Sequence, residues 1–188
     1  MNFFYEEFPK SVSVDGKDIE IITDFREYIK LMDMLADKNL NKKQKVQIIS
    51  QYFLEDIVIT PEAICALKDF IIMKTDNEIN EIEHQDDNLP RKKNLYSFTY
   101  DYPYILSAFM RDYHIDLEMV RYLHWWKFRM LFDGLSDDTE IKQRIMYRGI
   151  NIASIKSKEE KKRIRRIQAS IMLPQDQLTD YDIGNAFV

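Results

Sequence analysis

The stretch that decides the fold is Asp116-Leu-Glu-Met-Val-Arg-Tyr-Leu-His-Trp-Trp-Lys-Phe-Arg-Met-Leu-Phe-Asp-Gly-Leu135, which contains both tryptophans of the chain. Asp116 is a favourable N-cap residue, and Gly134 suits the left-handed residue that often follows a helix end. The spacing of the apolar residues between them is helical. These signals predict a central helix over residues 117–133.

The predicted helix has two apolar stripes, because successive side chains are about 100° apart. The broad stripe contains Met119, Val120, Leu123, Trp126, Met130 and Leu131, and the second contains Trp125, Phe128 and Phe132. A helix that is apolar on most sides is normally packed on two sides, which favours a core helix. The alternative is that the second stripe is exposed and binds a partner.

Two polar residues fall inside the broad apolar stripe. Lys127 must be ion-paired, extend its methylenes towards water, or contact a partner, and a structural role is the favoured interpretation. For His124, which lies among aromatic residues, a hydrogen-bonded core histidine is favoured over a ligand.

Composition indicates a mainly α-helical protein with a sizeable core. The 188 residues are 45% hydrophobic and 13% aromatic, with only four glycines and five prolines. The net charge of −5 is unevenly placed, because residues 1–90 carry 19 acidic and 10 basic side chains and residues 91–188 carry 13 and 17. Either a basic partner-binding face or charge complementarity within the chain explains this asymmetry.

Cysteine use and hydropathy favour a soluble protein of a reducing compartment. The single cysteine, Cys65, excludes an intramolecular disulfide, and its apolar neighbours predict a small buried residue. The N-terminus lacks the pattern of a signal peptide, and no apolar run approaches the ~18 residues of a membrane span. We therefore expect a soluble protein with no membrane partner.

The N-terminal part reads as a β-hairpin followed by three helices. Alternating residues over 11–23 surround Asp15-Gly16, a strong hairpin signal that predicts pairing of Val12 and Val14 with the Ile19 and Ile21 side. Caps and helical spacing then predict helices over residues 25–36, 42–54 and 61–73.

The C-terminal part reads as helices on both sides of the central one. Before it, residues 103–113 form a predicted helix that ends in a tight corner at His114-Ile115. After it, Ser136 or Asp137 begins a helix that ends near Gly149, and Ser157 begins a last helix that Pro174 ends. The fold class is therefore mainly α, a helical bundle of about six to seven helices with an N-terminal β-hairpin.

Composition also suggests a division of the chain. We expect an N-terminal part over 1–74, an acidic and polar linker or loop over 75–94, a C-terminal helical part over 95–173 and a flexible tail over 174–188. A single domain over 1–173 is the alternative.

The residues offer no pattern of enzymatic chemistry. Three histidines and one cysteine give no zinc spacing, and four glycines cannot form a phosphate-binding loop. We therefore expect no enzyme activity, no catalytic residue, no cofactor and no metal.

The last helix has a secondary basic face formed by Lys158, Lys161, Lys162, Arg165 and Arg166. A solvated face, or a site for the acidic linker or for an acidic partner helix, is favoured over a nucleic-acid site, because no aromatic residue interleaves and the pI is about 5.3.

The motif Tyr122-Leu-His-Trp-Trp-Lys-Phe128, followed by Gly134-Leu135 and Tyr147-Arg148, resembles a family of small proteins from phages and prophages of Gram-positive bacteria that is called gene product fifteen. The resemblance covers most of residues 96–174 and, more loosely, the N-terminal part. One departure is His114, where the family tends to have glycine.

The resemblance implies a role in tail morphogenesis, because the family's genes lie near the gene for the tape-measure protein. It implies a non-enzymatic tail assembly chaperone for that protein in the cytoplasm of the bacterial host cell, with a structural minor tail component or adaptor as the alternative. Other phage tail proteins and a homo-oligomer remain open as partners. The candidate contacts are Tyr122, Trp125, Lys127, Phe128 and Phe132.

Overall fold

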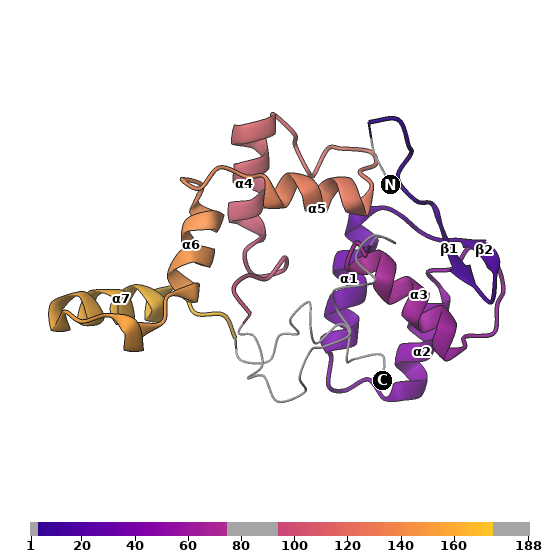
Figure 1. Ribbon diagram of the computed structural model, residues 1–188, viewed down its shortest axis with the longest axis horizontal. Coiled ribbons are helices and arrows are strands. Elements are labelled where there is room, and N and C mark those ends of the chain that lie inside the picture. The colour runs from indigo at the N-terminus through magenta and orange to yellow at the C-terminus, as the bar shows by residue number, and fades with distance from the viewer. Residues whose placement is uncertain (1–3, 75–93, 175–188) are drawn as a thin grey trace. The chain divides into compact units, whose positions relative to one another are not determined.

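A computed structural model describes residues 4–74 and 94–174 (Figure 1). Within these ranges lie a two-stranded antiparallel sheet, seven α-helices and a short 3-10 helix, which confirms a mainly α fold with an N-terminal hairpin. The chain forms two compact units. In the described ranges, the first unit comprises residues 4–74 with Tyr122–Phe128, and the second comprises residues 94–121 with 129–174.

This division assigns one segment differently from the division expected from composition. Residues 122–128 belong to the first unit, although both neighbouring segments belong to the second. The predicted linker, apart from Asn94, and the predicted tail beyond Pro174 lie outside the described residues.

The hairpin forms as its sequence predicts. β1 (Ser11–Val14) pairs with β2 (Lys17–Glu20), with Val12 opposite Ile19. Asp15 and Gly16 have φ values of 52° and 77°, the two positive values that a type I′ turn requires. A segment that we did not predict to lie beside the hairpin also bonds to it. The Leu54 amide donates to the Glu20 carbonyl of β2 at 2.9 Å.

Three helices complete the larger part of the first unit: α1 (Phe25–Ala36), α2 (Lys42–Ser50) and α3 (Pro61–Ile71). The predicted end of α2 at Leu54 is wrong. After Ser50 the chain turns and runs beside β2, where the Tyr52 carbonyl accepts a hydrogen bond from the Ile22 amide at 2.9 Å. The Tyr52 carbonyl and the Leu54 amide bond to the hairpin segment, while the Tyr52 and Phe53 amides close tight turns onto Ile49 and Ser50, so the α-helix does not continue.

The second unit contains α4 (Tyr102–Tyr113), the end of α5 (Trp125–Asp133), α6 (Glu140–Gly149), the 3-10 helix η2 (Ile152–Ser154) and α7 (Lys158–Ser170). The predicted start of α6 is early by a few residues. Thr139, not Ser136 or Asp137, is the N-cap, and its hydroxyl accepts from the Lys142 amide.

The predicted central helix over 117–133 is wrong in its first half, because α5 begins only at Trp125. The Asp116 carboxylate accepts from the Glu118 amide at 2.9 Å and caps a single turn. The chain then becomes extended and pairs with the segment before α1. The Leu123 carbonyl accepts from the Phe25 amide at 3.0 Å, and the Trp125 amide donates to the Thr23 carbonyl at 2.7 Å. These long-range bonds take the backbone groups that a continuous helix would need.

Gly134 also differs from expectation, because its φ is not positive. A Cβ atom at this position would lie 3.1 Å from the Tyr113 hydroxyl and 3.3 Å from the Met130 carbonyl oxygen. Close packing rather than a left-handed conformation therefore favours glycine here, because a side chain would force its neighbours to shift by a few tenths of an ångström. The left-handed residue is His114, with a φ of 54° at the end of α4.

Each unit has its own aromatic and aliphatic core. Buried residues of the first unit include Tyr28, Leu31, Leu35, Phe70 and Trp125, and those of the second include Ile105, Phe109, Phe132, Leu135 and Ile141. The prediction that Cys65 is buried is wrong, since it lies on the exposed side of α3.

Candidate functional site

The two adjacent tryptophans of the motif bind the end of α3. The indole N–H of Trp125 donates to the Ile71 carbonyl at 3.0 Å, and that of Trp126 donates to the Phe70 carbonyl at 2.8 Å. The last carbonyls of a helix lack partners within the helix. The pair of indoles therefore satisfies the C-terminus of α3, which explains why two tryptophans stand side by side in this motif.

His124 is a buried N-cap of α5. Its Nδ1 accepts from the Trp126 amide at 3.1 Å, so Nε2 carries the proton and donates to the Pro9 carbonyl at 2.9 Å. The ring stacks on Phe8 with centroids 5.0 Å apart. Burial lowers the pKa of His124, and the positive charge of Lys10 acts in the same direction, whereas the bond to Pro9 opposes it. His124 is therefore a neutral core histidine.

The second apolar stripe of the motif lies in the core rather than on the surface. Trp125, Phe128 and Phe132 are 0%, 1% and 2% exposed. Phe128 stacks on Phe25 in the first unit at 4.6 Å, and Phe132 packs against Tyr96 in the second at 4.9 Å. These rings fill the cores of their units, so the favoured interpretation of a core stripe is confirmed and the alternative of an exposed stripe that includes Trp125, Phe128 and Phe132 as contacts is wrong.

The other two candidate contacts, Tyr122 and Lys127, are exposed. Tyr122 is 53% exposed, and its hydroxyl shares a hydrogen bond of 2.8 Å with that of Thr23. Among the described residues Lys127 has no ion pair.

A buried ion pair accounts for the other charged residue of the motif. Arg148 is 5% exposed and binds Asp101, which is 1% exposed, through two bonds of 2.6 and 2.9 Å. Arg148 also donates to the carbonyls of Leu95 and Ile171 at 2.9 and 2.7 Å. One guanidinium thus joins α6 to the start of α4, to the segment before it and to the end of α7. From the sequence, Arg148 was recognised only as part of the motif. Its partner Asp101 lies 47 residues away, and no pattern near Arg148 indicates this pairing.

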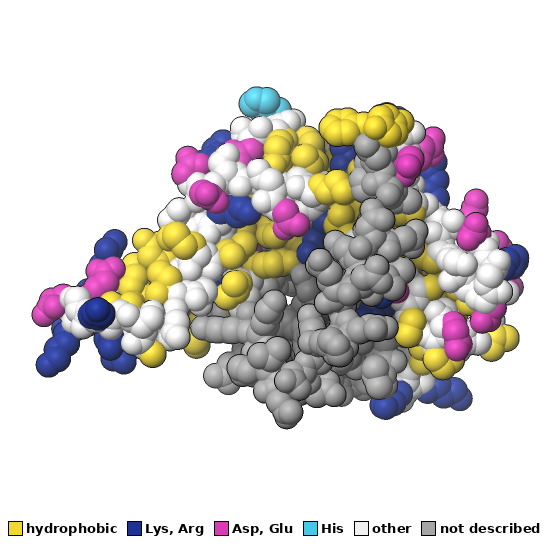
Figure 2. All heavy atoms as spheres, in the orientation of Figure 1, with side chains coloured by type: hydrophobic (Ala, Val, Ile, Leu, Met, Phe, Trp, Pro, Cys, Tyr) yellow, Lys and Arg dark blue, Asp and Glu magenta, His cyan; other side chains and the backbone are white. Residues whose placement is uncertain are grey.

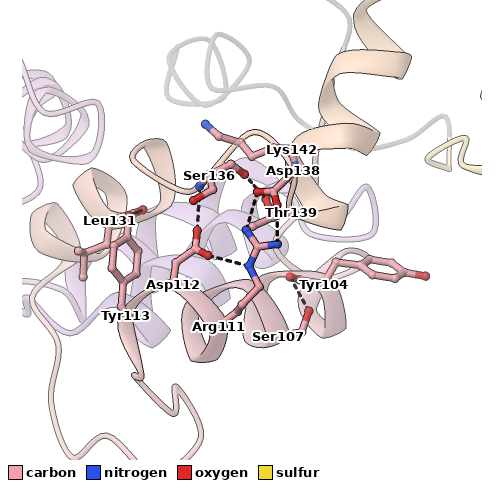
Figure 3. Close-up of polar contacts among 10 residues, drawn as sticks. All are labelled: Tyr104, Ser107, Arg111, Asp112, Tyr113, Leu131, Ser136, Asp138, Thr139 and Lys142. Atoms are coloured by element: carbon pink, nitrogen blue, oxygen red, sulfur yellow. Dashed lines mark hydrogen bonds and ion pairs between the residues drawn. The ribbon is translucent and has the colours of Figure 1, made fainter.

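The corner between α4 and α6 carries a second polar cluster (Figure 3). Arg111 donates to Asp112 at 2.8 Å and to both carboxylate oxygens of Asp138, while Asp112 accepts from the Ser136 amide at 2.8 Å. The Ser136 bond, followed by that from Arg111, lowers the pKa of Asp112. Each carboxylate is satisfied by a neighbour, so this cluster holds the loop in place and offers no unpaired reactive group.

The methionines are distributed unevenly between the units. All five in the second unit are exposed, with exposed fractions from 40% to 78%, and those of the first unit that the structure describes are half-buried. The exposed five, here called the methionine surface, are Met110, Met119, Met130, Met146 and Met172. They lie on α4, α5 and α6 and in the segments after α4 and α7. Exposed Tyr100 and Tyr102 add to the apolar area of the same unit.

The basic face predicted on the last helix is present on α7. Lys158, Lys162, Arg165 and Arg166 are exposed and Lys161 is half-buried. Figure 2 shows hydrophobic side chains where α6 meets α7 and Lys and Arg side chains towards the far end of α7.

Residues 4–74 and 94–174 contain neither a metal-ligand cluster nor a helix that could span a membrane. Three or more histidine, cysteine, aspartate or glutamate side chains do not gather there in a position to hold a metal ion. Every helix in these ranges is too short or too polar to cross a bilayer.

Fold and motif together define a mainly α-helical protein in which one aromatic segment supplies core residues to each unit. The family model described as Bacteriophage Gp15 protein matches residues 4–173, and the chain belongs to this family. The match confirms the resemblance carried by Tyr122–Phe128 and extends it over the N-terminal unit. Comparison with curated proteins and with solved structures gave no match.

Proposed function

We propose that this protein is a non-enzymatic tail assembly chaperone that binds the tape-measure protein in the cytoplasm of the host cell. Membership of the family supports the broader class, a phage structural or morphogenesis protein. The more specific role is supported by the surface chemistry of the second unit.

The methionine surface is the observation that carries the proposal. The five methionines expose large apolar side chains to water, and a partner that covered them would gain the free energy of their burial. Methionine is flexible and polarisable, so its side chains can adapt to partner helices of differing sequence. A tape-measure protein presents a long helix that must be kept soluble until it is enclosed, and a methionine-rich surface suits the apolar face of such a helix.

Co-expression tests the proposal. The tape-measure protein of the same phage is expressed alone and together with this chain, and its soluble fraction and co-purification are measured. We expect a soluble complex only when both are expressed. An insoluble tape-measure protein that does not co-purify would overturn the proposal.

A structural component of the virion is the second candidate, and the hairpin favours it. β1 has β2 on one side, and within the described residues no strand lies on its other side, so it offers an edge to a neighbouring protein. Mass spectrometry of purified virions separates the candidates. A chaperone is absent from mature particles, whereas a structural component is present at a fixed stoichiometry.

A further inference from the structure

α7 is attached to the second unit chiefly through its C-terminal half. Ile164 is its one buried residue. The Gln168 amide donates to the carbonyls of Tyr147 and Ile150 at 2.8 and 2.9 Å, and Arg148 binds the Ile171 carbonyl. Within that unit the first turns of α7 extend away from α4 and α6 (Figure 1). This part of the helix is accessible along its outer side.

Four basic residues form one stripe on that outer side. Lys158, Lys162, Arg165 and Arg166 fall within an arc of about 100° centred opposite Ile164, and they span about 12 Å along the axis. All four are exposed. Of the two acidic residues of the helix, Glu160 lies off this stripe and pairs with Arg163 at 3.5 Å, whereas Glu159 borders the stripe and accepts from the Ser157 hydroxyl. We call the four residues the α7 stripe.

The α7 stripe differs from the other basic surfaces of the described chain. Elsewhere basic side chains often face a carboxylate, as in Lys17 with Glu55 and Arg144 with Glu140. In residues 4–74 and 94–174, none of the four stripe residues has an ion pair. Lys158 and Lys162, and Lys162 and Arg166, are like charges four residues apart, a spacing that destabilises a helix. The helix therefore carries a repulsion between like charges that an acidic partner would relieve.

We propose that the α7 stripe docks an acidic amphipathic helix of a partner protein, independently of the methionine surface. The spacing of three to four residues matches carboxylates repeated along one face of a second helix. A nucleic acid fits less well, because no aromatic side chain interleaves with the stripe and the whole chain carries a net charge of −5.

Binding of designed peptides to the full chain tests this assignment. Three synthetic helical peptides share one leucine stripe and carry glutamate, glutamine or lysine on its flanks, and a short duplex DNA is a fourth probe. Titration calorimetry is performed with the wild type, with the quadruple variant K158E/K162E/R165E/R166E and with the control K43E/R121E, which reverses two exposed charges elsewhere. Circular dichroism checks that each variant retains its helices.

We expect the wild type and the control to bind the glutamate peptide about 30-fold more tightly than the glutamine peptide, from four exposed pairs of about 0.5 kcal/mol each. The quadruple variant should lose this preference and bind the lysine peptide instead. Equal affinity for the glutamate and glutamine peptides, absence of binding, or tighter binding of the DNA would each overturn the assignment. None of these results bears on the tape-measure proposal, which is tested through a different surface.

Discussion

At the residue scale, neutral His124 makes stability depend on pH. Its pKa in the folded chain is lowered below the ordinary value of about 6.5, so the unfolded chain binds more protons between the two pKa values. Stability is therefore complete above about pH 6.5 and falls as pH decreases through this window. Protonation of Nδ1 would also remove the acceptor for the Trp126 amide.

Replacement of His124 by asparagine should remove this pH dependence. Asparagine keeps an N-cap acceptor but loses the bond to Pro9, so H124N should be less stable at neutral pH by about 1–2 kcal/mol. Between about pH 7.5 and about pH 5.5, urea unfolding should show a smaller loss of stability for H124N than for the wild type. The variant H114N, at an exposed histidine, is the control. Equal losses in H124N and the wild type would contradict this role.

Arg148 should be one of the most sensitive positions. Its replacement by methionine leaves the buried Asp101 carboxylate without a counter-charge, and breaking a buried pair in this way costs about 3–5 kcal/mol. The double variant D101N/R148M removes both charges and should recover part of that loss. The free energy of unfolding in urea measures both effects. A loss below about 1 kcal/mol for R148M would show that the ion pair does not hold these elements together.

Two glycines should respond to alanine with opposite signs. At Gly134 the new methyl group would crowd the Tyr113 hydroxyl, so G134A should destabilise the chain by about 1 kcal/mol. At Gly149, the last residue of α6, the methyl group would lie 3.6 Å from Leu95, which is an ordinary contact, so G149A should stabilise by about 0.5–1 kcal/mol. Melting temperatures of the two variants measured side by side check the prediction, and a change of the same sign in both would contradict it.

At the element scale, local chemistry determined which predictions were correct. The hairpin follows from Asp15-Gly16, and α3 begins at Thr60-Pro61, because the turn and the cap are set by adjacent residues. The break before α5 could not be predicted in this way. Residues 117–124 have helical spacing, but Leu123 and Trp125 bond to residues 25 and 23, which lie far away in the sequence.

The same distinction applies to the site. The motif was identified from its unusual residues, but the roles of its members depend on partners that no local pattern shows, such as the carbonyls of Phe70 and Ile71. Trp125 and Phe128 are buried in the core of the first unit, and Phe132 is buried in the core of the second. A helical wheel shows that the three residues share one side of a helix, but it does not show whether that side is buried. The methionine surface likewise becomes evident only when exposure is known for each residue.

The bonds from the motif to α3 predict a local effect of tryptophan replacement. W125F leaves the Ile71 carbonyl without a partner among the described residues, whereas after W126F the Phe70 carbonyl still accepts from the Met73 amide at 3.1 Å. A buried unsatisfied acceptor costs about 1–3 kcal/mol, so W125F should be the more destabilising. Hydrogen exchange at the end of α3 should accelerate in both variants. Unchanged exchange there would contradict the capping role of the indoles.

At the scale of the whole molecule, the two units differ in what they present to solvent. The first unit uses the motif to complete its own core, while the second carries the methionine surface and the α7 stripe. We infer that the second unit makes the contacts with partners and that the motif of the family maintains the fold. Mutations in the motif should therefore reduce stability, and mutations in the methionine surface should reduce binding without unfolding the chain.

The most direct test of the central claim measures how much tape-measure protein co-purifies with surface variants of this chain. M110E/M130E/M146E places charge on the methionine surface, M110L/M130L/M146L keeps it apolar, and L54E/V58E is a control at exposed apolar residues of the first unit. We predict that the glutamate variant of the methionine surface loses the tape-measure protein, while the leucine variant and the control retain it. Full retention by a folded M110E/M130E/M146E variant would contradict the claim.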